Sequence, residues 1–488
     1  MTASHDSMAR ARRVALASMI GTVAEYYDFF VYGTAAALVF GKLFFPTADP
    51  LLGTVAAFAS FAVGFVARPL GGMVFGHFGD RVGRKKALIV TILIVGLGTV
   101  LIGLLPTFAQ IGVWAPIALI AIRILQGFGV GGEQAGAVLL TAEYAPPARR
   151  GLMASLVQTG APAGFLIPSA LFAILTHTLS AAQFLAWGWR IPFIASALLV
   201  VIGLYIRLRI DESPVFAEIR QARQVESRPV IEVLRRFPRV IAGGLVAKLV
   251  ETVAFTMYSM VVLAYGRAHG LDASMILQTI IVAVIIELPM IPLAGWLSDR
   301  VGRRPVYLFG ALVHFALAYP FFLAMDTGQR LPLQLAMIGA LSIGHACCYA
   351  PQASLFPELF PARVRCSGIA LIWQFGSLIG GGVFSVVSIK LIQVAHGGST
   401  SIVLYMMAIA AVSGLALLTL PETAPGRRRG QDIHDWGTID SASAAMPAVS
   451  GAALVPTAMA APTPKPTAMA TAASKPAHDE ARAALRHS

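Results

Sequence analysis

A stretch of ten residues occurs twice in this chain: GHFGDRVGRK at positions 76–85 returns as GWLSDRVGRR at positions 295–304. Both copies follow an apolar run and carry Asp, Gly and Arg in the same register. A looser echo joins EYAPPARRG at 143–151 to ELFPARVR at 358–365, again after apolar runs. The chain is therefore predicted to consist of two halves that repeat in the same orientation.

Composition places both halves in a membrane. Of 488 residues, 57% are apolar and 12% are charged, with a mean hydropathy of +0.74. A soluble domain carries about 25% charged residues, so this chain has too little charge to coat a water-facing surface. An apolar helix of about 20 residues spans a bilayer. Twelve such segments are predicted, at 14–40, 51–77, 87–106, 113–142, 151–177, 188–208, 240–265, 273–298, 305–325, 331–352, 364–392 and 401–420.

The positions of Lys and Arg predict how the spans are oriented. One set of connections is rich in them: Arg10, Arg12 and Arg13, then Arg81 to Lys86, Arg149 and Arg150, the stretch 207–239, Arg300 to Arg304, Arg363 and Arg365, and 427–429. The alternate connections hold little beyond Lys42, Arg190, Arg267, Arg330 and Lys390. By the positive-inside rule the rich set is cytoplasmic, which places both termini inside the cell. The net charge of +13 is spread over these short clusters, so no nucleic-acid partner is expected.

The predicted architecture is all-α and integral to the membrane, with four parts. These are an N-terminal six-helix bundle (1–208), a cytoplasmic linker (209–239), a C-terminal six-helix bundle (240–420) and a disordered cytoplasmic tail (421–488). The linker is mixed in charge and holds three prolines, and the tail is rich in Ala, Pro, Thr and Ser without apolar periodicity. Parallel six-span repeats are the plan of transporters whose substrate site lies between the two pseudo-symmetric halves.

These motifs resemble a known family. The doubled G-x-x-x-D-R-x-G-R-[RK] loop is similar to the signature of the major facilitator superfamily. Within it, GTVAEYYDFFVYG at 21–33, RPLGG at 68–72, RILQGFGVGGE at 123–133 and PQASLF at 351–356 resemble the metabolite:proton symporters, which include carriers of shikimate, 2-oxoglutarate, citrate, and proline or betaine. The resemblance covers about residues 10–420. It implies the major facilitator fold, a bacterial inner membrane location, coupling to protons, and function as a monomer.

Four positions depart from the family's pattern. Relatives commonly have Trp where this chain has Tyr26 and again where it has Gln134, and an Arg with Glu-Asn where it has Lys248 with Glu251-Thr252. These changes lie beside the candidate charges of the cavity. The fold therefore transfers from the resemblance, whereas the identity of the ligand does not.

Several charged residues fall inside predicted spans: Glu25 and Asp28 in the first, Arg68 in the second, Arg123 and Glu133 in the fourth, Lys248 and Glu251 in the seventh, and Glu287 in the eighth. A charge at the centre of a span costs at least about 2.5 to 3.5 kcal/mol, so each should face protein or a water-filled cavity. Counted from the span midpoints at about 1.5 Å per residue, Arg68 and Glu133 lie about 6 and 7.5 Å toward the cytoplasm and can pair. Asp28 and Arg123 lie toward the outside and form a second expected pair.

These charges suggest two kinds of site. A buried carboxylate lowers its energy by pairing with a cation or by taking up a proton, so the candidates for proton coupling are Glu25, Asp28, Glu133 and Glu251. The candidates for substrate binding are Tyr26, Tyr27, Arg68, Arg123, Gln126, Gln134, Lys248 and His345. The alternative is structural: pairs such as Arg68 with Glu133 only pin spans together.

The repeated loops are predicted to form a polar latch. Gly83 and Gly302 permit a tight turn, and Asp80 and Asp299 can meet a helix N-terminus or the arginines that follow them. The gating residues are Asp80, Arg81, Gly83, Arg84, Asp299, Arg300, Gly302 and Arg303. The alternative is that the arginines only anchor the topology. The resemblance implies that the latch closes the cytoplasmic side in the outward-facing state.

The sequence favours a secondary active transporter that moves a small organic acid, a mono-, di- or aromatic carboxylate, inward with protons by alternating access. A proton-coupled carrier of zwitterions or osmolytes of the proline or betaine type is the alternative, and a metabolite receptor without transport is a remote one. No ATP-binding motif, metal-ligand spacing or nucleophile–base arrangement appears, so we expect no enzyme, cofactor or metal. The expected partners are the substrate, protons and the lipid bilayer.

Overall fold

The computed structural model describes residues 2–47, 50–395 and 398–425. Within these ranges the chain forms helices joined by short turns, and twelve helices are long and apolar enough to cross a membrane. Each overlaps one predicted span, which confirms the all-α, twelve-span prediction. The predicted disordered tail falls mostly on residues 426–488, which lie outside the described residues.

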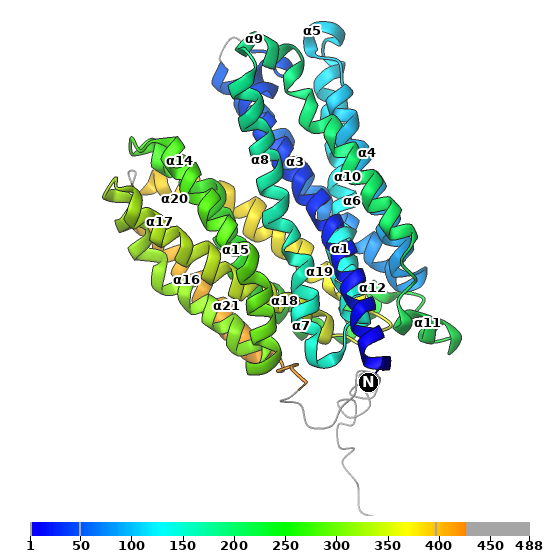
Figure 1. The fold of residues 1–488 in the computed structure, drawn as a ribbon. Coiled ribbons are helices and arrows are strands. Elements are labelled where there is room, and N and C mark those ends of the chain that lie inside the picture. Colours follow the sequence, from blue (N-terminus) through cyan, green and yellow to red (C-terminus); the bar gives the residue numbers. More distant parts are fainter. Residues whose placement is uncertain (1, 48–49, 396–397, 426–488) are drawn as a thin grey trace, which may run out of the picture. The chain divides into compact units, whose positions relative to one another are not determined.

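The first six spans form the N-terminal bundle (Figure 1). Their elements are α1 (Thr2–Ala35), η1 (Ala36–Phe40), α2 (Gly41–Leu43), α3 (Pro50–Arg81), α4 (Arg84–Leu104), α5 (Phe108–Ile111), α6 (Trp114–Tyr144), η2 (Pro147–Arg149), α7 (Arg150–Gln158), α8 (Gly160–Thr178), α9 (Ala181–Gln183), η3 (Phe184–Gly188) and α10 (Arg190–Leu208). Helices α3 and α4 pack on α6, α10 packs on α4, and α8 packs on α1.

The last six spans form the C-terminal bundle. Their elements are α13 (Pro238–Thr256), η4 (Met257–Val261), α14 (Val262–Ala268), α15 (Ala273–Val301), α16 (Arg303–Asp326), α17 (Arg330–Met337), η5 (Ile338–His345), α18 (Ala346–Glu358), α19 (Arg365–Ser377), η6 (Leu378–Val383), α20 (Phe384–Val394) and α21 (Thr400–Thr419). The π-helical segments η4, η5 and η6 interrupt the seventh, tenth and eleventh spans. Such segments are rare and occur frequently at functional sites.

Two short helices, α11 (Pro214–Gln221) and α12 (Pro229–Arg236), lie between the bundles in the sequence. Each begins with a proline at its first position, where the missing N–H removes no helical hydrogen bond. The N-terminus and α11 lie at the same end of the helices (Figure 1). We call this end the linker side and the opposite end the far side.

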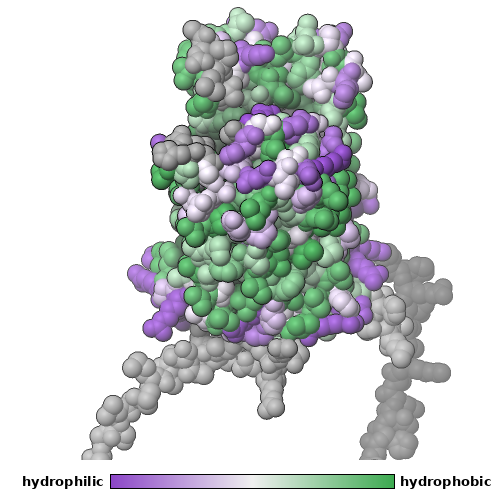
Figure 2. All heavy atoms as spheres, turned by 90° about the vertical axis from the view of Figure 1, so that its left-hand side faces the viewer, coloured by the Kyte–Doolittle hydropathy of each residue, from purple (hydrophilic) through white to green (hydrophobic). Residues whose placement is uncertain are grey.

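The outer face of the C-terminal bundle is apolar. Figure 2 shows a broad hydrophobic belt with hydrophilic residues gathered below it, at the linker side, and above it. Large exposed side chains from several spans contribute to apolar surface here, among them Leu293, Phe309, Leu312, Leu335 and Leu415. A belt of this extent is typical of a surface in contact with lipid chains.

The bundles share one apolar core on the linker side and keep separate cores on the far side. The linker-side cluster combines Leu88 and Val138 of the N-terminal bundle with Phe356 and Ile372 of the C-terminal bundle. On the far side, the buried members of one cluster all come from the N-terminal bundle and those of another all come from the C-terminal bundle. Partly buried side chains such as Phe165 and Phe255 pack against the cluster of the other bundle. The linker side is therefore the closed side in this structure.

Two helix crossings bring the bundles together. Helix α3 packs along α19, and α15 packs along α7. The first glycine of each repeated motif lies at a crossing: a Cβ on Gly76 would come within 2.9 Å of the Ser367 Cα, and one on Gly295 within 2.1 Å of the Ser155 Oγ. Glycine is required at these two positions because any side chain would separate the helices.

Candidate functional site

The repeated loops join the bundles on the linker side. Asp80, near the end of α3, accepts hydrogen bonds from the backbone N–H groups of Cys366 and Ser367 near the start of α19, at 3.1 and 2.8 Å. Asp299, near the end of α15, accepts two from the start of α7, at 2.8 and 2.9 Å. The first N–H groups of a helix lack acceptors within the helix, and the dipole there favours negative charge. The predicted contact of both aspartates with helix N-termini is confirmed.

The turns after these aspartates depend on glycine. Gly83 and Gly302 have φ values of 125° and 119°, a backbone region that residues other than glycine rarely adopt. Among the described contacts, no hydrogen bond or ion pair joins the predicted gating residues Arg81 and Arg300 to the other bundle. Both are exposed, and the guanidinium carbon of Arg300 lies 4.0 Å from the centre of the Trp296 ring.

Ion pairs support each aspartate. Arg84 lies 3.5 Å from Asp80 and 3.4 Å from Glu143, and Arg365 of α19 lies 3.3 Å from Glu143. The second repeat has the same arrangement, with Arg303 to Asp299 at 2.6 Å, Arg303 to Glu358 at 3.5 Å and Arg150 to Glu358 at 3.2 Å. We call these eight residues the latch. The looser sequence echo begins at Glu143 and Glu358, so it marks the part of the latch that the residue types alone did not indicate.

Two further acidic residues lie under the latch and were not expected. Glu212 accepts hydrogen bonds from the N–H of Arg84 at 3.0 Å and from the next residue at the start of α4. Glu422 does the same at the start of α16, with the N–H of Arg303 at 2.8 Å. Each follows the last span of its half in the patterns ESP (212–214) and ETAP (422–425), a signal that the sequence does contain.

The N-terminal bundle contains a buried ion pair. Arg123 donates to Asp28 at 2.7 Å, and Thr99 and Gln126 each donate to the other carboxylate oxygen at 2.6 Å. The guanidinium also lies over two aromatic rings, with its carbon 4.4 Å from the centre of the Tyr32 ring. Asp28 and Arg123 are 1% and 3% exposed. The predicted pair is confirmed, and its charges satisfy each other.

The predicted pairing of Arg68 with Glu133 is wrong. Glu133 forms an ion pair with Arg207, near the end of α10, and accepts a hydrogen bond from Thr91 at 2.6 Å. Glu133 thus faces α4 and α10 within its own bundle. Equal depth fixes only one coordinate of a side chain, and rotation about the helix axis turns this one away from Arg68.

Arg68 is left without a carboxylate. Among the described residues no ion pair reaches it, and its guanidinium carbon lies 4.5 Å from the centre of the Phe65 ring and 5.5 Å from that of Phe29. Glu25 is the carboxylate whose charge acts most strongly on it, yet no described hydrogen bond or ion pair joins them, and one Glu25 oxygen is buried without a partner. The half-buried Arg68 and the buried Glu25 are thus two opposite charges that no described hydrogen bond or ion pair joins.

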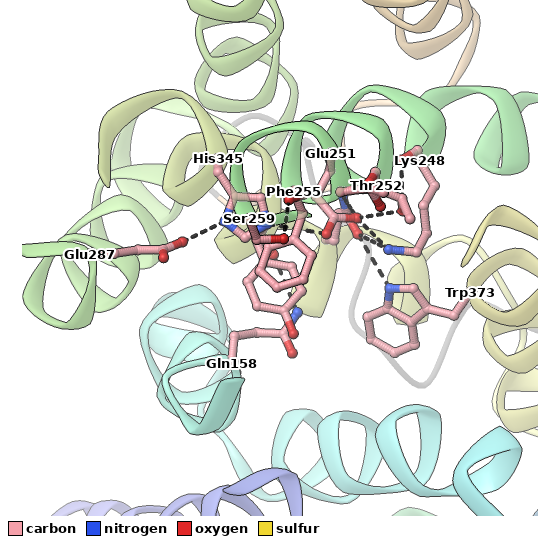
Figure 3. A network of polar contacts seen from close by, with 12 residues as sticks. Gln158, Lys248, Glu251, Thr252, Phe255, Ser259, Glu287, His345 and Trp373 are labelled. Carbon is pink, nitrogen blue, oxygen red and sulfur yellow. Dashed lines mark hydrogen bonds and ion pairs between the residues drawn. The ribbon is translucent and has the colours of Figure 1, made fainter. Parts of the chain in front are cut away.

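The C-terminal bundle contains a connected network (Figure 3). His345, the last residue of η5, places its Nδ1 2.5 Å from a Glu287 oxygen and its Nε2 3.3 Å from a Glu251 oxygen. Lys248 pairs with the other Glu251 oxygen and lies 3.2 Å from the Gln352 side-chain oxygen. All of these side chains are buried.

Hydrogen bonds between Tyr26, Gln134 and Tyr349 form a polar bridge that joins the two bundles. The hydroxyl of Tyr349 lies 3.1 Å from that of Tyr26 and accepts a hydrogen bond from Gln134 at 2.8 Å. Two further hydrogen bonds cross between the bundles, from Gln158 to the Tyr349 carbonyl at 3.4 Å and from Gln374 to the Gly131 carbonyl at 2.9 Å. Gln134 and Tyr26, two of the predicted substrate residues, therefore lie at the contact between the bundles.

The other candidates have partners within their own bundle. Tyr27 is buried and donates to the Pro192 carbonyl at 2.7 Å, and Gln126 is held by Asp28 and Arg123. Their polar groups are occupied in this structure, unlike that of Arg68. Within the described part of the chain, no three His, Cys, Asp or Glu side chains are grouped so that they could hold a metal ion.

Comparisons with known proteins agree with this architecture. A family model described as Major Facilitator Superfamily matches residues 18–381 and also 244–473. The chain is 39% identical to the shikimate transporter of Escherichia coli K12 over 420 residues, which covers 86% of this chain and 96% of that protein. It is 36% identical to the proline/betaine transporter of Salmonella typhimurium LT2 over 390 residues, 76% of either chain.

One solved structure shares the fold at low sequence identity. The proton:xylose symporter XylE bound to 6-bromo-6-deoxy-D-glucose superposes with a TM-score of 0.69 at 18% identity, covering 89% of this chain and 99% of that one. These relatives and this structural neighbour are transporters, not enzymes.

Proposed function

Because the chain belongs to the major facilitator superfamily, we propose that it is a proton-coupled symporter that takes up a small organic anion by alternating access. The positive-inside rule makes the linker side, rich in Lys and Arg, the cytoplasmic side, and we expect both termini to face the cytoplasm. The closed linker side then corresponds to an outward-facing state, in which substrate enters from the far side.

The unpartnered guanidinium of Arg68 carries the proposal for the substrate. An arginine inside a span is costly without a carboxylate, and this one has two phenyl rings and no ion pair among the described residues. A substrate carboxylate fits the planar fork of the guanidinium in two parallel hydrogen bonds. Phe29 and Phe65 beside it offer apolar surface to a ring or carbon skeleton.

The relatives support an anion and keep one alternative open. Shikimate, the compound named for one relative, is a ring compound with a single carboxylate. A zwitterion of the proline or betaine type is the second candidate, because Glu25 next to Arg68 could receive its positive group. In both cases the carboxylate of the ligand binds Arg68. The two candidates differ in whether Glu25 also contacts the ligand.

The test is uptake into proteoliposomes of labelled shikimate, 2-oxoglutarate, citrate, proline and glycine betaine, with and without an acidic exterior. We expect accumulation of at least one of the three organic acids that depends on the pH gradient and disappears with a protonophore. Accumulation of proline or betaine instead would favour the zwitterion carrier, and no gradient-dependent uptake of any compound would overturn the proposal.

A pair of variants then tests whether the substrate carboxylate binds Arg68. Arg68→Lys keeps the charge and loses the planar fork, so we expect it to weaken binding of the transported acid. Arg267→Lys, at an exposed residue near the far end of the seventh span, is the matched control and should leave binding unchanged. Wild-type affinity in Arg68→Lys would move recognition to another residue.

A further inference from the structure

His345 lies between two carboxylates, and both ring nitrogens are engaged. Nδ1 faces Glu287 of α15 at 2.5 Å, and Nε2 faces Glu251 of α13 at 3.3 Å (Figure 3). A neutral imidazole has one N–H and one bare nitrogen, whereas an ionised carboxylate can only accept. A neutral ring would therefore set a lone pair against a carboxylate oxygen on one side. The geometry requires a second proton in the triad.

The charge balance of the network leads to the same conclusion. Lys248 is the neighbouring cation, and it pairs with Glu251. With an imidazolium at His345, two positive charges balance the two glutamates. Without that proton the buried cluster carries one uncompensated negative charge, which is strongly unfavourable in the interior.

Other titratable groups around the ring do not replace this proton. Tyr349 of α18 stacks on the imidazole at 5.0 Å between ring centres, Tyr26 of α1 bonds to Tyr349, and His314 of α16 lies within electrostatic range but hydrogen-bonds to nothing described. Phe255 of α13 also lies against the ring, tilted by 33° with 5.3 Å between ring centres. Aromatic faces favour a cationic ring over a neutral one.

The two rings that cover His345, those of Tyr349 and Phe255, also make contacts between the bundles. Phe255 packs edge-on against Tyr26 at 6.5 Å between ring centres, and the Tyr349 hydroxyl meets that of Tyr26 at 3.1 Å. A movement of α1 away from the C-terminal bundle would separate both covers from their partner. Access of water to His345 is thus tied to the arrangement of the bundles.

We propose that His345, held as an imidazolium between Glu251 and Glu287, is the group that carries the coupled proton. It takes up the proton with its covers open to one side of the membrane and releases it to water on the other side, where the triad is left with one proton fewer. This inference rests on the proposed symport for its role, whereas the protonation state can be tested without any substrate.

The first experiment measures the protonation state directly. Purified full-length protein with ¹⁵N-labelled histidine gives ten histidine side chains, and the His345 signals are those lost in His345→Gln. At about pH 7, where a free histidine is mostly neutral, we expect both His345 nitrogens to be protonated. Glu287→Gln, which removes a charge and keeps the shape, should convert the ring to the neutral form. A bare nitrogen on His345 in the wild-type protein at this pH overturns the proposal.

The second experiment tests coupling, with labelled shikimate or whichever compound of the panel is transported. A gradient of one pH unit supports at most about tenfold accumulation for one proton per substrate. In Glu287→Gln this accumulation should fall to equal concentrations on both sides, while exchange of internal for external substrate persists. His314→Gln, equally buried at 2% against 3% exposure, is the matched control and should accumulate like wild type.

The outcomes separate this inference from the proposed function. Wild-type accumulation by Glu287→Gln overturns the coupling role of the triad even if the ring is an imidazolium. If no panel compound is transported by the wild-type protein, the symport proposal fails, and the spectroscopic result still decides the protonation state of His345.

Discussion

Replacing Asp80 by Asn should open the linker side. The carboxylate of Asp80 is 1% exposed and accepts two backbone N–H groups from the other bundle. The amide of Asn keeps one acceptor oxygen and presents an NH₂ group to the second N–H. Arg84 retains Glu143, so the substitution leaves no buried arginine without a carboxylate.

The magnitude follows from these contacts. A hydrogen bond to a charged group contributes about 1.5 to 3 kcal/mol, and a neutral one about 1 kcal/mol. Exchanging two of the first kind for one of the second destabilises the closed state by about 2 to 5 kcal/mol. Since about 1.4 kcal/mol is tenfold, the ratio of open to closed linker sides should rise by a factor between about 30 and several thousand.

A native thiol reports this opening. Cys366 lies beside the latch, where its N–H donates to Asp80, and is 2% exposed. Its sulfur is so close to α3 that a Cβ on Gly79 would come within 2.7 Å of it. The chain has three cysteines, so a background with Cys347→Ala and Cys348→Ala leaves Cys366 as the single thiol. While the closed state dominates, the rate of maleimide labelling follows the open fraction, and we expect a rise of at least about tenfold in Asp80→Asn.

Two further variants make the test specific. Asp211→Asn removes an exposed carboxylate from the linker region and should leave the labelling rate unchanged. Asp299→Asn breaks the other half of the latch, which does not touch Cys366, and should raise the rate by a similar factor if the bundles separate as units. Equal rates in Asp80→Asn and wild type would refute the reasoning, and a rise with Asp80→Asn alone would reduce it to local loosening around the thiol.

Three other substitutions test individual residues. Glu133→Gln should lower the free energy of unfolding by about 3 kcal/mol, measured by thermal or denaturant melting, because it leaves the buried Arg207 short of a carboxylate, and coupling should be intact. Arg123→Lys should retain the pair with Asp28 and cost less substrate affinity in a binding assay than Arg68→Lys, since its charge is already satisfied. Gly83→Ala should weaken the closed latch by about 1 to 3 kcal/mol, seen as faster labelling of Cys366, because alanine is strained at φ 125°.

The spans and the latch could be predicted from the sequence because their signals are local. Low charge and apolar runs define the twelve helices, and a repeated motif gives two independent copies of the same turn. Asp80 and Asp299 at span ends can reach only a few kinds of partner, and an adjoining helix start is the most favourable of them. Glu212 and Glu422 were not predicted, although each lies at the corresponding position after the last span of its half. A single Glu after a span does not by itself indicate a particular contact.

Pairing inside the bundles could be predicted only in part. The depth count placed Asp28 and Arg123 within reach, and they also share a facing direction. For Glu133 the count failed because its partner, Arg207, lies at the last turn of a span among basic residues that read as linker. A long arginine side chain can extend back into the bundle from that position, and no count of span residues shows it.

The contact of His345 with Glu287 was not predicted because of local helix geometry. The π-helix η5 ends at His345, and its wider turn shifts the face on which the following residues lie. A helical wheel with 3.6 residues per turn therefore assigns the wrong face beyond such a segment. The sequence indicated a histidine and a glutamate at mid-depth and gave no means of joining them.

The distribution of partners decides which intramembrane charges can take part in transport. Breaking a buried pair by removing one member costs about 3 to 5 kcal/mol, and a ligand that displaces a partner gains only the difference between two similar interactions. The ion pairs of Arg123 with Asp28 and of Arg207 with Glu133 are therefore poor places for a substrate to bind. Arg68 has no such competitor among the described residues, so a carboxylate that reaches it gains its interaction in full. We therefore expect an anion to gain more by binding Arg68 than by displacing a partner from either of these ion pairs.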